Sequence, residues 1–124
     1  MSEKNLPVFG FERLEVWQKA VAFAGVVYKL TRGFPREELF GLTAQLRRAS
    51  VSVAANIAEG ASRSSQKDQS RFFEIAYGSL NEMVTLLQIA SEQELISKDQ
   101  MVCARLQISD MCRMLSGLRR RNEQ

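Results

Sequence analysis

Histidine is absent from this chain of 124 residues. Its absence removes the commonest general base near neutral pH and the commonest transition-metal ligand. A serine or cysteine nucleophile activated by histidine is therefore excluded. The sequence also lacks a phosphate-binding loop and a GxGxxG pattern. An enzyme is accordingly the weakest of the functions considered, and we expect no catalytic, cofactor-binding or metal-binding residues.

Cysteine is nearly absent, with only Cys103 and Cys112 in the chain. Their spacing places the two side chains about 180° apart on a helix, so they neither form a disulfide nor share a metal. We expect both to serve as small hydrophobic residues in a reducing compartment.

Long hydrophobic runs are lacking as well. The longest uncharged stretches are about ten residues, whereas a membrane-spanning helix needs roughly twenty. The polar start MSEKNLP is not followed by the apolar core of a signal peptide. The net charge of +3 is too small to indicate a nucleic-acid partner by itself. We therefore expect a soluble, cytoplasmic protein that does not contact a membrane.

The sequence does contain apolar residues at helical spacing in four segments. The most apolar of them, QLRRASVSVAANIAEG at 45–60, has no charge between Ala49 and Ala58. Helices are predicted over 13–32, from about Pro35 to Glu59, over 68–92 and over 98–118. Gly41 marks a kink or a restart in the second, and Gly60 is expected to cap its end. Ser65 and Ser97 each begin a capping-box pattern before the third and fourth helices.

Helices of about twenty residues with short connections predict an all-α, up-down-up-down antiparallel four-helix bundle. We expect one domain over 1–124, with an irregular N-terminal arm at 1–12 and a basic C-terminal tail at 119–124. Gly78, in mid-helix, is expected to allow another backbone to pack closely. The predicted core consists of Trp17, Leu46, Val53, Ile57, Phe72, Leu80, Leu87, Ile108 and Leu115.

The first two helices are apolar over more than one face, which a bundle of four cannot cover. This excess predicts a homo-oligomer in which subunits bury apolar side chains against one another. The candidates for that interface are Val16, Phe23, Val27, Val51, Ala54 and Ala58.

A row of polar residues follows the apolar face of the second helix, and a matching row flanks the core of the third. Antiparallel pairing about Ser64 places Arg48 near Ser79 and Glu82, and Glu59 near Arg71. This polar seam is either a ligand or partner site or a network that fixes the register of the bundle, and its balanced charges favour the structural role. Its members are Arg48, Ser52, Asn56, Glu59, Arg71, Ser79 and Glu82.

Basic residues cluster in two places, around the second connection and at the C-terminus. Arginines at a helix C-terminus also stabilise the helix dipole, which is an alternative reason for their presence. The cations that the seam leaves free are candidate contacts for RNA or DNA, namely Arg47, Arg63, Lys67, Arg119, Arg120 and Arg121.

Three segments of the chain resemble the bacterial four-helix-bundle family of 23S rRNA intervening-sequence proteins. They are FERLEVWQKA at 11–20, FPREELFGLTAQLRRASVSVAANIAEG at 34–60 and FFEIAYGSLNE at 72–82. Where this family often has a proline, the chain has Ala54, which predicts a straighter second helix. The resemblance implies a non-enzymatic bundle that forms a homopentamer. It also implies kinship with the accessory protein of diversity-generating retroelements, which works with nucleic acid.

Two functions therefore remain in competition. One is an oligomeric adaptor associated with nucleic acid or a ribonucleoprotein. The other is a structural assembly module that binds a protein partner and has no nucleic-acid role.

Overall fold

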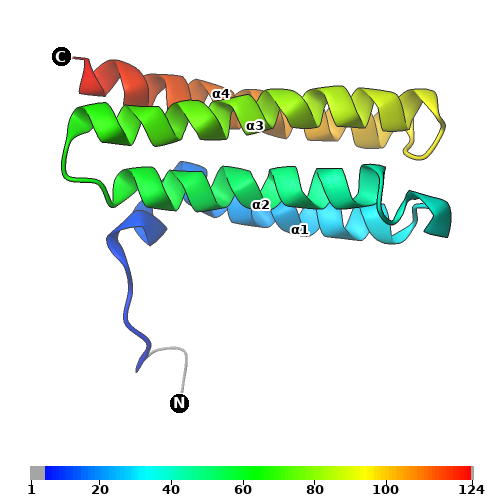
Figure 1. Ribbon diagram of the computed structural model, residues 1–124, viewed down its shortest axis with the longest axis horizontal. Helices are drawn as coiled ribbons and strands as arrows, with labels where there is room; N and C mark the ends of the chain where they lie inside the picture. The colour runs from blue at the N-terminus through cyan, green and yellow to red at the C-terminus, as the bar shows by residue number, and fades with distance from the viewer. Residues whose placement is uncertain (1–4, 124) are drawn as a thin grey trace.

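The structure is a computed structural model that describes residues 5–123. Its elements are the 3-10 helices η2 (Gly10–Arg13) and η3 (Arg36–Glu38) and the α-helices α1 (Glu15–Arg32), α2 (Leu42–Ala61), α3 (Gln66–Glu92) and α4 (Lys98–Asn122). The described residues contain no strand. Figure 1 shows the four long helices running alternately up and down, which confirms the predicted all-α bundle.

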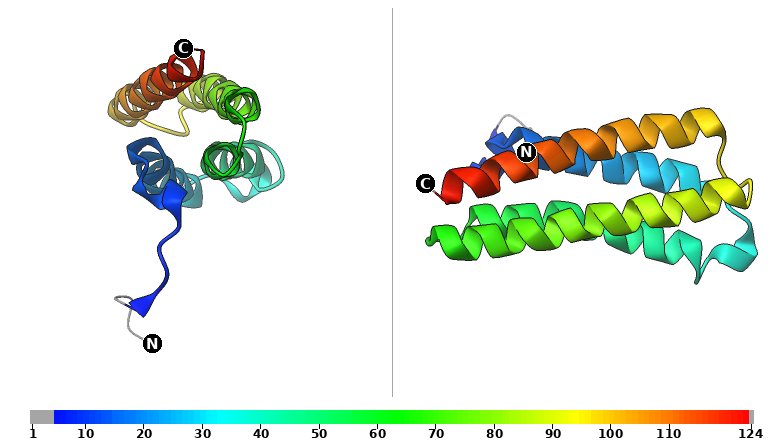
Figure 2. Two further views of the ribbon diagram at one scale, coloured as in Figure 1. Left: turned by 90° about the vertical axis from the view of Figure 1, so that its left-hand side faces the viewer. Right: turned by 90° about the horizontal axis from the view of Figure 1, so that it is seen from above.

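The bundle has two layers, α1 beside α2 and α3 beside α4 (Figure 2). The most extensive helix contact joins α2 to α3 across the layers, and the least extensive joins α1 to α4. Ser65 begins α3 by accepting a hydrogen bond from the Asp68 backbone N–H. Ser97 and Gln100 form a full capping box at the start of α4. The predicted capping box at Ser97 is thus confirmed, whereas Ser65 caps α3 without the reciprocal bond and the helix begins at Gln66, two residues before the predicted start.

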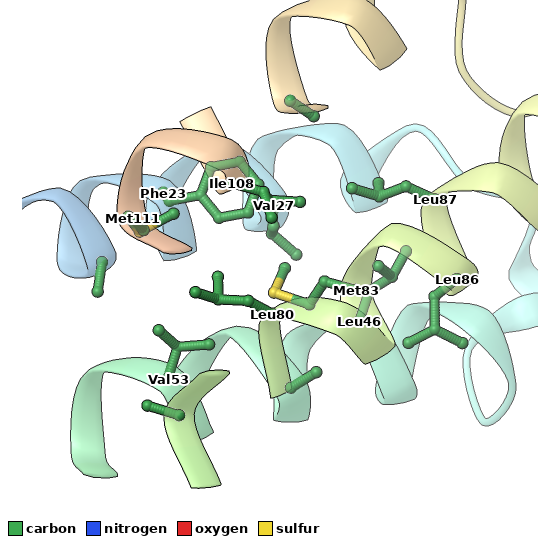
Figure 3. Close-up of a cluster of buried hydrophobic side chains, with 14 of the residues drawn as sticks. Phe23, Val27, Leu46, Val53, Leu80, Met83, Leu86, Leu87, Ile108 and Met111 are labelled. Atoms are coloured by element: carbon green, nitrogen blue, oxygen red, sulfur yellow. The ribbon is translucent and has the colours of Figure 1, made fainter. Parts of the chain in front are cut away.

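Buried hydrophobic side chains from all four helices fill the centre of the bundle (Figure 3). Most of the predicted core is confirmed, namely Leu46, Val53, Ile57, Leu80, Leu87, Ile108 and Leu115. Trp17 and Phe72 are only half-buried, and their neighbours Val16 and Phe73 occupy the core instead. One position along a helix is a rotation of about 100°. On α1 the prediction therefore chose the wrong one of two adjacent apolar rows, whereas on α3 only Phe72 is misplaced and Leu80 and Leu87 of its row are buried.

This rotation also corrects the predicted subunit interface. Val16, Phe23 and Val27 are buried within the bundle itself and are unavailable to a second copy. Val51 is exposed, and Ala54 and Ala58 are half-buried. Of the proposed interface residues, only those on α2 therefore remain.

Of three glycines with predicted roles, Gly41 fulfils one of its two alternatives, and Gly60 and Gly78 differ from theirs. Gly41 precedes the first residue of α2, so the helix restarts there and then runs uninterrupted through Ala54 to Ala61. Gly60 lies inside α2 with a negative φ and does not cap it, because Ser62 holds that position. Gly78 is exposed, and no atom lies within 4 Å of a Cβ added to it, so it allows no close backbone approach within the described chain.

Gly60 is required for the packing of α2 on α3. A Cβ at this position would lie 2.9 Å from Phe73 Cε1 and 3.0 Å from Phe72 Cβ. Contacts this short force the two helices to move apart or the rings to shift.

We predict opposite effects of alanine at two of these helical glycines. Gly60→Ala should lower the free energy of unfolding by about 1–3 kcal/mol, because the added methyl overpacks the α2–α3 contact. Gly78→Ala should raise it by about 0.5–1 kcal/mol, because alanine favours the helix and meets no neighbour. Urea unfolding followed by circular dichroism measures both, and a stabilising Gly60→Ala would contradict the packing described here.

Candidate nucleic-acid interface

The predicted polar seam between α2 and α3 is present but is built from uncharged residues. The hydroxyls of Ser52 and Ser79 lie 3.0 Å apart and hydrogen-bond across the two helices. Asn56 donates its side-chain N–H to the Ser52 carbonyl oxygen at 2.8 Å and to the Ser52 hydroxyl at 3.1 Å. The Ser52–Ser79 contact thus joins the two helices, and Asn56 holds Ser52 from within α2.

The charged contacts predicted for this seam are wrong. Arg48 and Glu82 are exposed, and neither forms a hydrogen bond or ion pair with another residue of 5–123. Because Ser52 pairs with Ser79, the midpoint of the antiparallel α2–α3 pair lies between Ser65 and Gln66. The prediction had placed this midpoint at Ser64. This register places Met83, the neighbour of Glu82, level with Arg48. The charged pair is therefore missing because both side chains are exposed to solvent, and the register still keeps them at a similar level.

The other pair predicted for the seam, Glu59 with Arg71, does not form, and each residue has a different partner. Glu59 forms an ion pair with Arg63, one turn further along the chain. The Arg71 guanidinium lies over the Phe72 ring, 4.9 Å from its centroid, and the Arg63 guanidinium lies 4.8 Å from the same centroid. Phe72 therefore places two cations side by side at the end of the bundle.

Arg47, predicted as a nucleic-acid contact, is occupied inside the protein. Its Nε–H donates to the Thr31 hydroxyl at 2.9 Å, and its guanidinium lies 4.7 Å from the centroid of the Tyr28 ring. The buried Thr31 hydroxyl in turn donates to the Val27 carbonyl oxygen at 2.8 Å. Arg47 thus joins α2 to α1, and we remove it from the candidate interface.

The remaining predicted contacts gather at one end of the bundle, where α2 ends, α3 begins and α4 ends (Figure 1). The expected C-terminal tail is helical as far as Asn122 and packs on the start of α3. Asn122 donates its side-chain N–H to the Ser70 hydroxyl at 3.1 Å, and Arg119 lies 3.8 Å from a Glu74 carboxylate oxygen. We call this surface the basic end; its cations are Arg63, Lys67, Arg71, Arg119, Arg120 and Arg121.

The cations of the basic end differ in whether they form ion pairs with carboxylates. Arg63 and Arg119 are paired with carboxylates. Lys67, Arg120 and Arg121 are exposed, and no carboxylate within residues 5–123 lies within 4.0 Å of them. Sequence reasoning missed Arg71 because it assigned that residue to the seam, although the adjacent Phe72 could have indicated its position.

A hollow between α3 and α4 adjoins the basic end. Its lining is largely polar and consists of Tyr77, Ser109, Cys112, Arg113, Ser116 and Arg120. The Arg113 guanidinium donates to the Asp110 carboxylate at 2.6 Å and, together with Lys19, lowers the pKa of that carboxyl. Burial raises the pKa of the Cys112 thiol, so the protonated, unreactive form is favoured. This hollow offers hydroxyl and guanidinium donors and no activated nucleophile.

Within residues 5–123, no group of three or more cysteine, aspartate or glutamate side chains could hold a metal ion. Every buried side-chain nitrogen and oxygen of this part of the chain has a hydrogen-bond partner. No helix in it is long and apolar enough to cross a membrane.

These features define a class of protein: an antiparallel four-helix bundle with an apolar core, an uncharged α2–α3 seam and a basic end. The family model of the 23S rRNA-intervening sequence protein matches residues 12–117. The chain belongs to this family, and the resemblance found in its sequence is confirmed.

A solved structure shows the same fold. It is a crystal structure of a protein with unknown function from the S23 ribosomal protein family of Bacteroides thetaiotaomicron. It is 24% identical to this chain and has a TM-score of 0.78, covering 85% of this chain and 95% of the other. The comparison with curated proteins gave no match. The family model and the solved structure together define the family and the fold of this chain.

We predict that two adjacent arginines of α2 contribute very differently to stability. Arg47→Ala should lower the free energy of unfolding by about 1–2 kcal/mol, because it removes the hydrogen bond to Thr31 and the stacking on Tyr28. Arg48→Ala should change it by less than about 0.5 kcal/mol, because Arg48 is exposed and unpaired. Chemical denaturation of the two variants tests this, and equal losses would show that Arg48 makes a contact of comparable strength.

Proposed function

We propose that this protein is a non-enzymatic, self-associating bundle that binds the phosphate backbone of RNA or DNA through its basic end. The observation that carries the proposal is the gathering of six cations from the connection between α2 and α3, from the start of α3 and from the end of α4. Lys67, Arg120 and Arg121 are exposed and lack a carboxylate partner within residues 5–123. Such cations bind phosphate by releasing the counterions that surround the nucleic acid.

The same surface supports contact with the backbone over reading of bases. The Phe72 ring is covered by two guanidiniums and is unavailable to stack on a base. Arginine and lysine contacts to phosphate position a nucleic acid without reading its sequence. We therefore expect binding with little preference for sequence.

Self-association would strengthen this binding. One copy offers few free cations, so its affinity for a single strand is expected to be weak. Several copies joined in one particle repeat the basic end, and linked sites can raise the overall affinity by about 10²–10⁴ when one strand reaches several of them. We retain the homopentamer implied by the family resemblance as the proposed assembly.

The second candidate function is a structural module that binds a protein partner. It is favoured by the large apolar side chains exposed on the helices, which are Val21, Tyr28, Val51, Ile75, Ile89, Val102 and Leu106. A complex with a defined protein that survives nuclease treatment would favour this alternative. A complex that dissociates on nuclease treatment would favour the nucleic-acid proposal.

We predict that the triple variant Lys67→Ser, Arg120→Ser, Arg121→Ser binds a fluorescent single-stranded RNA more weakly than the parent. The salt dependence of its affinity should become shallower, by about 0.7 in the log–log slope for each phosphate that the variant no longer neutralises. Fluorescence anisotropy at several salt concentrations measures both quantities.

The matched control removes three exposed cations from the opposite end of the bundle, in the variant Lys29→Ser, Arg32→Ser, Lys98→Ser. It lowers the net charge equally and should keep the affinity close to that of the parent. Equal losses in the two triple variants would indicate a general charge effect. Absence of binding by the parent at low salt would contradict the proposal.

A further inference from the structure

Phe40 is the most exposed large hydrophobic residue of the described chain, with 91% of its surface accessible. It lies in the short turn between η3 and α2, which projects from the side of the bundle (Figure 2). The turn is held by its own hydrogen bonds, since the Gly41 N–H donates to the Glu38 carbonyl oxygen at 3.0 Å and a Glu38 carboxylate oxygen accepts from the Leu42 N–H at 3.3 Å. The backbone thus fixes a solvated aromatic residue in a projecting position.

An apolar groove lies in the opposite layer, between α3 and α4. It encloses about 540 Å³, and Val84 and Ile108 lie among its lining residues. Val102 and Leu106 on α4 also line it, and they remain 57% and 67% exposed. These two exposed side chains and the groove beside them form an apolar surface that an inserted aromatic side chain could cover.

We propose that the turn carrying Phe40 in one copy of this protein inserts into the α3–α4 groove of a second copy. The inference rests on the self-association included in the proposed function, and it names the surfaces that would meet. Aromatic side chains that fill a pocket commonly provide most of the energy of such an interface.

Charge complementarity supports a second copy as the occupant. Glu37 lies in η3, three residues before Phe40, and is exposed, as is its neighbour Arg36. Arg105 lines the groove beside Leu106 and is also exposed. Within residues 5–123 neither Glu37 nor Arg105 has an ion-pair partner. Insertion of Phe40 would bring Glu37 close to Arg105, the charged residue among those that line the groove.

The register of the helices also places the two surfaces at the same level along the bundle. Ser52 lies opposite Ser79, and Ser70 lies opposite Asn122. Extending this antiparallel register places the turn at Phe40 level with the first turns of α4, where Val102 lies. If two copies are related by a rotation about an axis parallel to the helices, the turn of one copy stays at the same height as the groove of the next. Such a rotation can therefore bring the two surfaces together.

The turn and the groove are different surfaces, so one copy can offer its turn to one neighbour and its groove to another. Contacts of this type build a closed ring when the rotation between copies closes.

The first test measures particle mass by light scattering for the parent and for Phe40→Glu at micromolar concentration. We expect the parent to be a multiple of 14.0 kDa and the variant to shift toward a single copy. Ile75→Glu, a charge placed on another exposed apolar residue outside the groove, should keep the parent mass. A monomeric parent, or a Phe40→Glu variant that stays assembled, would overturn the inference. Thermal unfolding should show that Phe40→Glu remains folded, since its side chain contacts little within one copy.

The second test reverses the charges. Glu37→Lys and Arg105→Glu should each weaken assembly, and the double variant should recover mass because the pair is restored in the opposite sense. General destabilisation cannot produce such recovery. A double variant no better assembled than either single variant would overturn the pairing of Glu37 with Arg105.

The outcome separates this inference from the nucleic-acid proposal. Single copies of Phe40→Glu keep the basic end, so weak, salt-dependent RNA binding by them supports the basic-end proposal whatever the mass shows. The triple variant of Lys67, Arg120 and Arg121 should lose RNA binding and remain assembled. If Phe40→Glu assembles like the parent and still binds RNA, the proposed interface is overturned and the nucleic-acid proposal stands.

Discussion

The packing of α2 against α3 is the constraint on which the rest of this structure depends. This helix pair has the most extensive contact in the bundle. It is close because Gly60 lets the rings of Phe72 and Phe73 approach the α2 backbone, and because Ser52 and Ser79 are short enough to hydrogen-bond directly. Longer charged side chains at the centre of the seam would hold the helices apart. The charged residues of the two rows therefore point to solvent or pair along their own helix.

This packing determines where the charges of the molecule lie. A short connection between α2 and α3 brings Arg63, Lys67 and Arg71 to one end, and the antiparallel direction of α4 adds its three terminal arginines. Phe72 orders two of these cations by lying beneath their guanidiniums. The basic end is thus a consequence of helix direction and connection length, although its residues are far apart along the chain. The apolar groove and the turn at Phe40 lie toward the other end of the bundle, which leaves the basic end free in the proposed assembly.

Local patterns predicted the elements of the fold well and their mutual orientation less well. The capping residues Ser65 and Ser97, the apolar rows and the short connections predicted four antiparallel helices, because each depends on neighbours within about one helical turn. Trp17 and Phe72 were assigned to the core although Val16 and Phe73 occupy it. Two adjacent apolar rows are equivalent in the sequence, and only contact with the other helices decides which one is buried.

The candidate site shows the same division. The sequence by itself determined that the chain forms four amphipathic helices, that it lacks histidine-based chemistry and that its cations cluster near a turn and at the C-terminus. Only the tertiary structure decided that Arg47 is held by Thr31 and Tyr28, that Arg48 is free and that Phe40 projects into solvent. The physical reason is that helix periodicity sets the angle of a side chain about its own axis. Its partner depends on the rotation and register of the neighbouring helix, which side-chain packing sets only once all four helices are in contact.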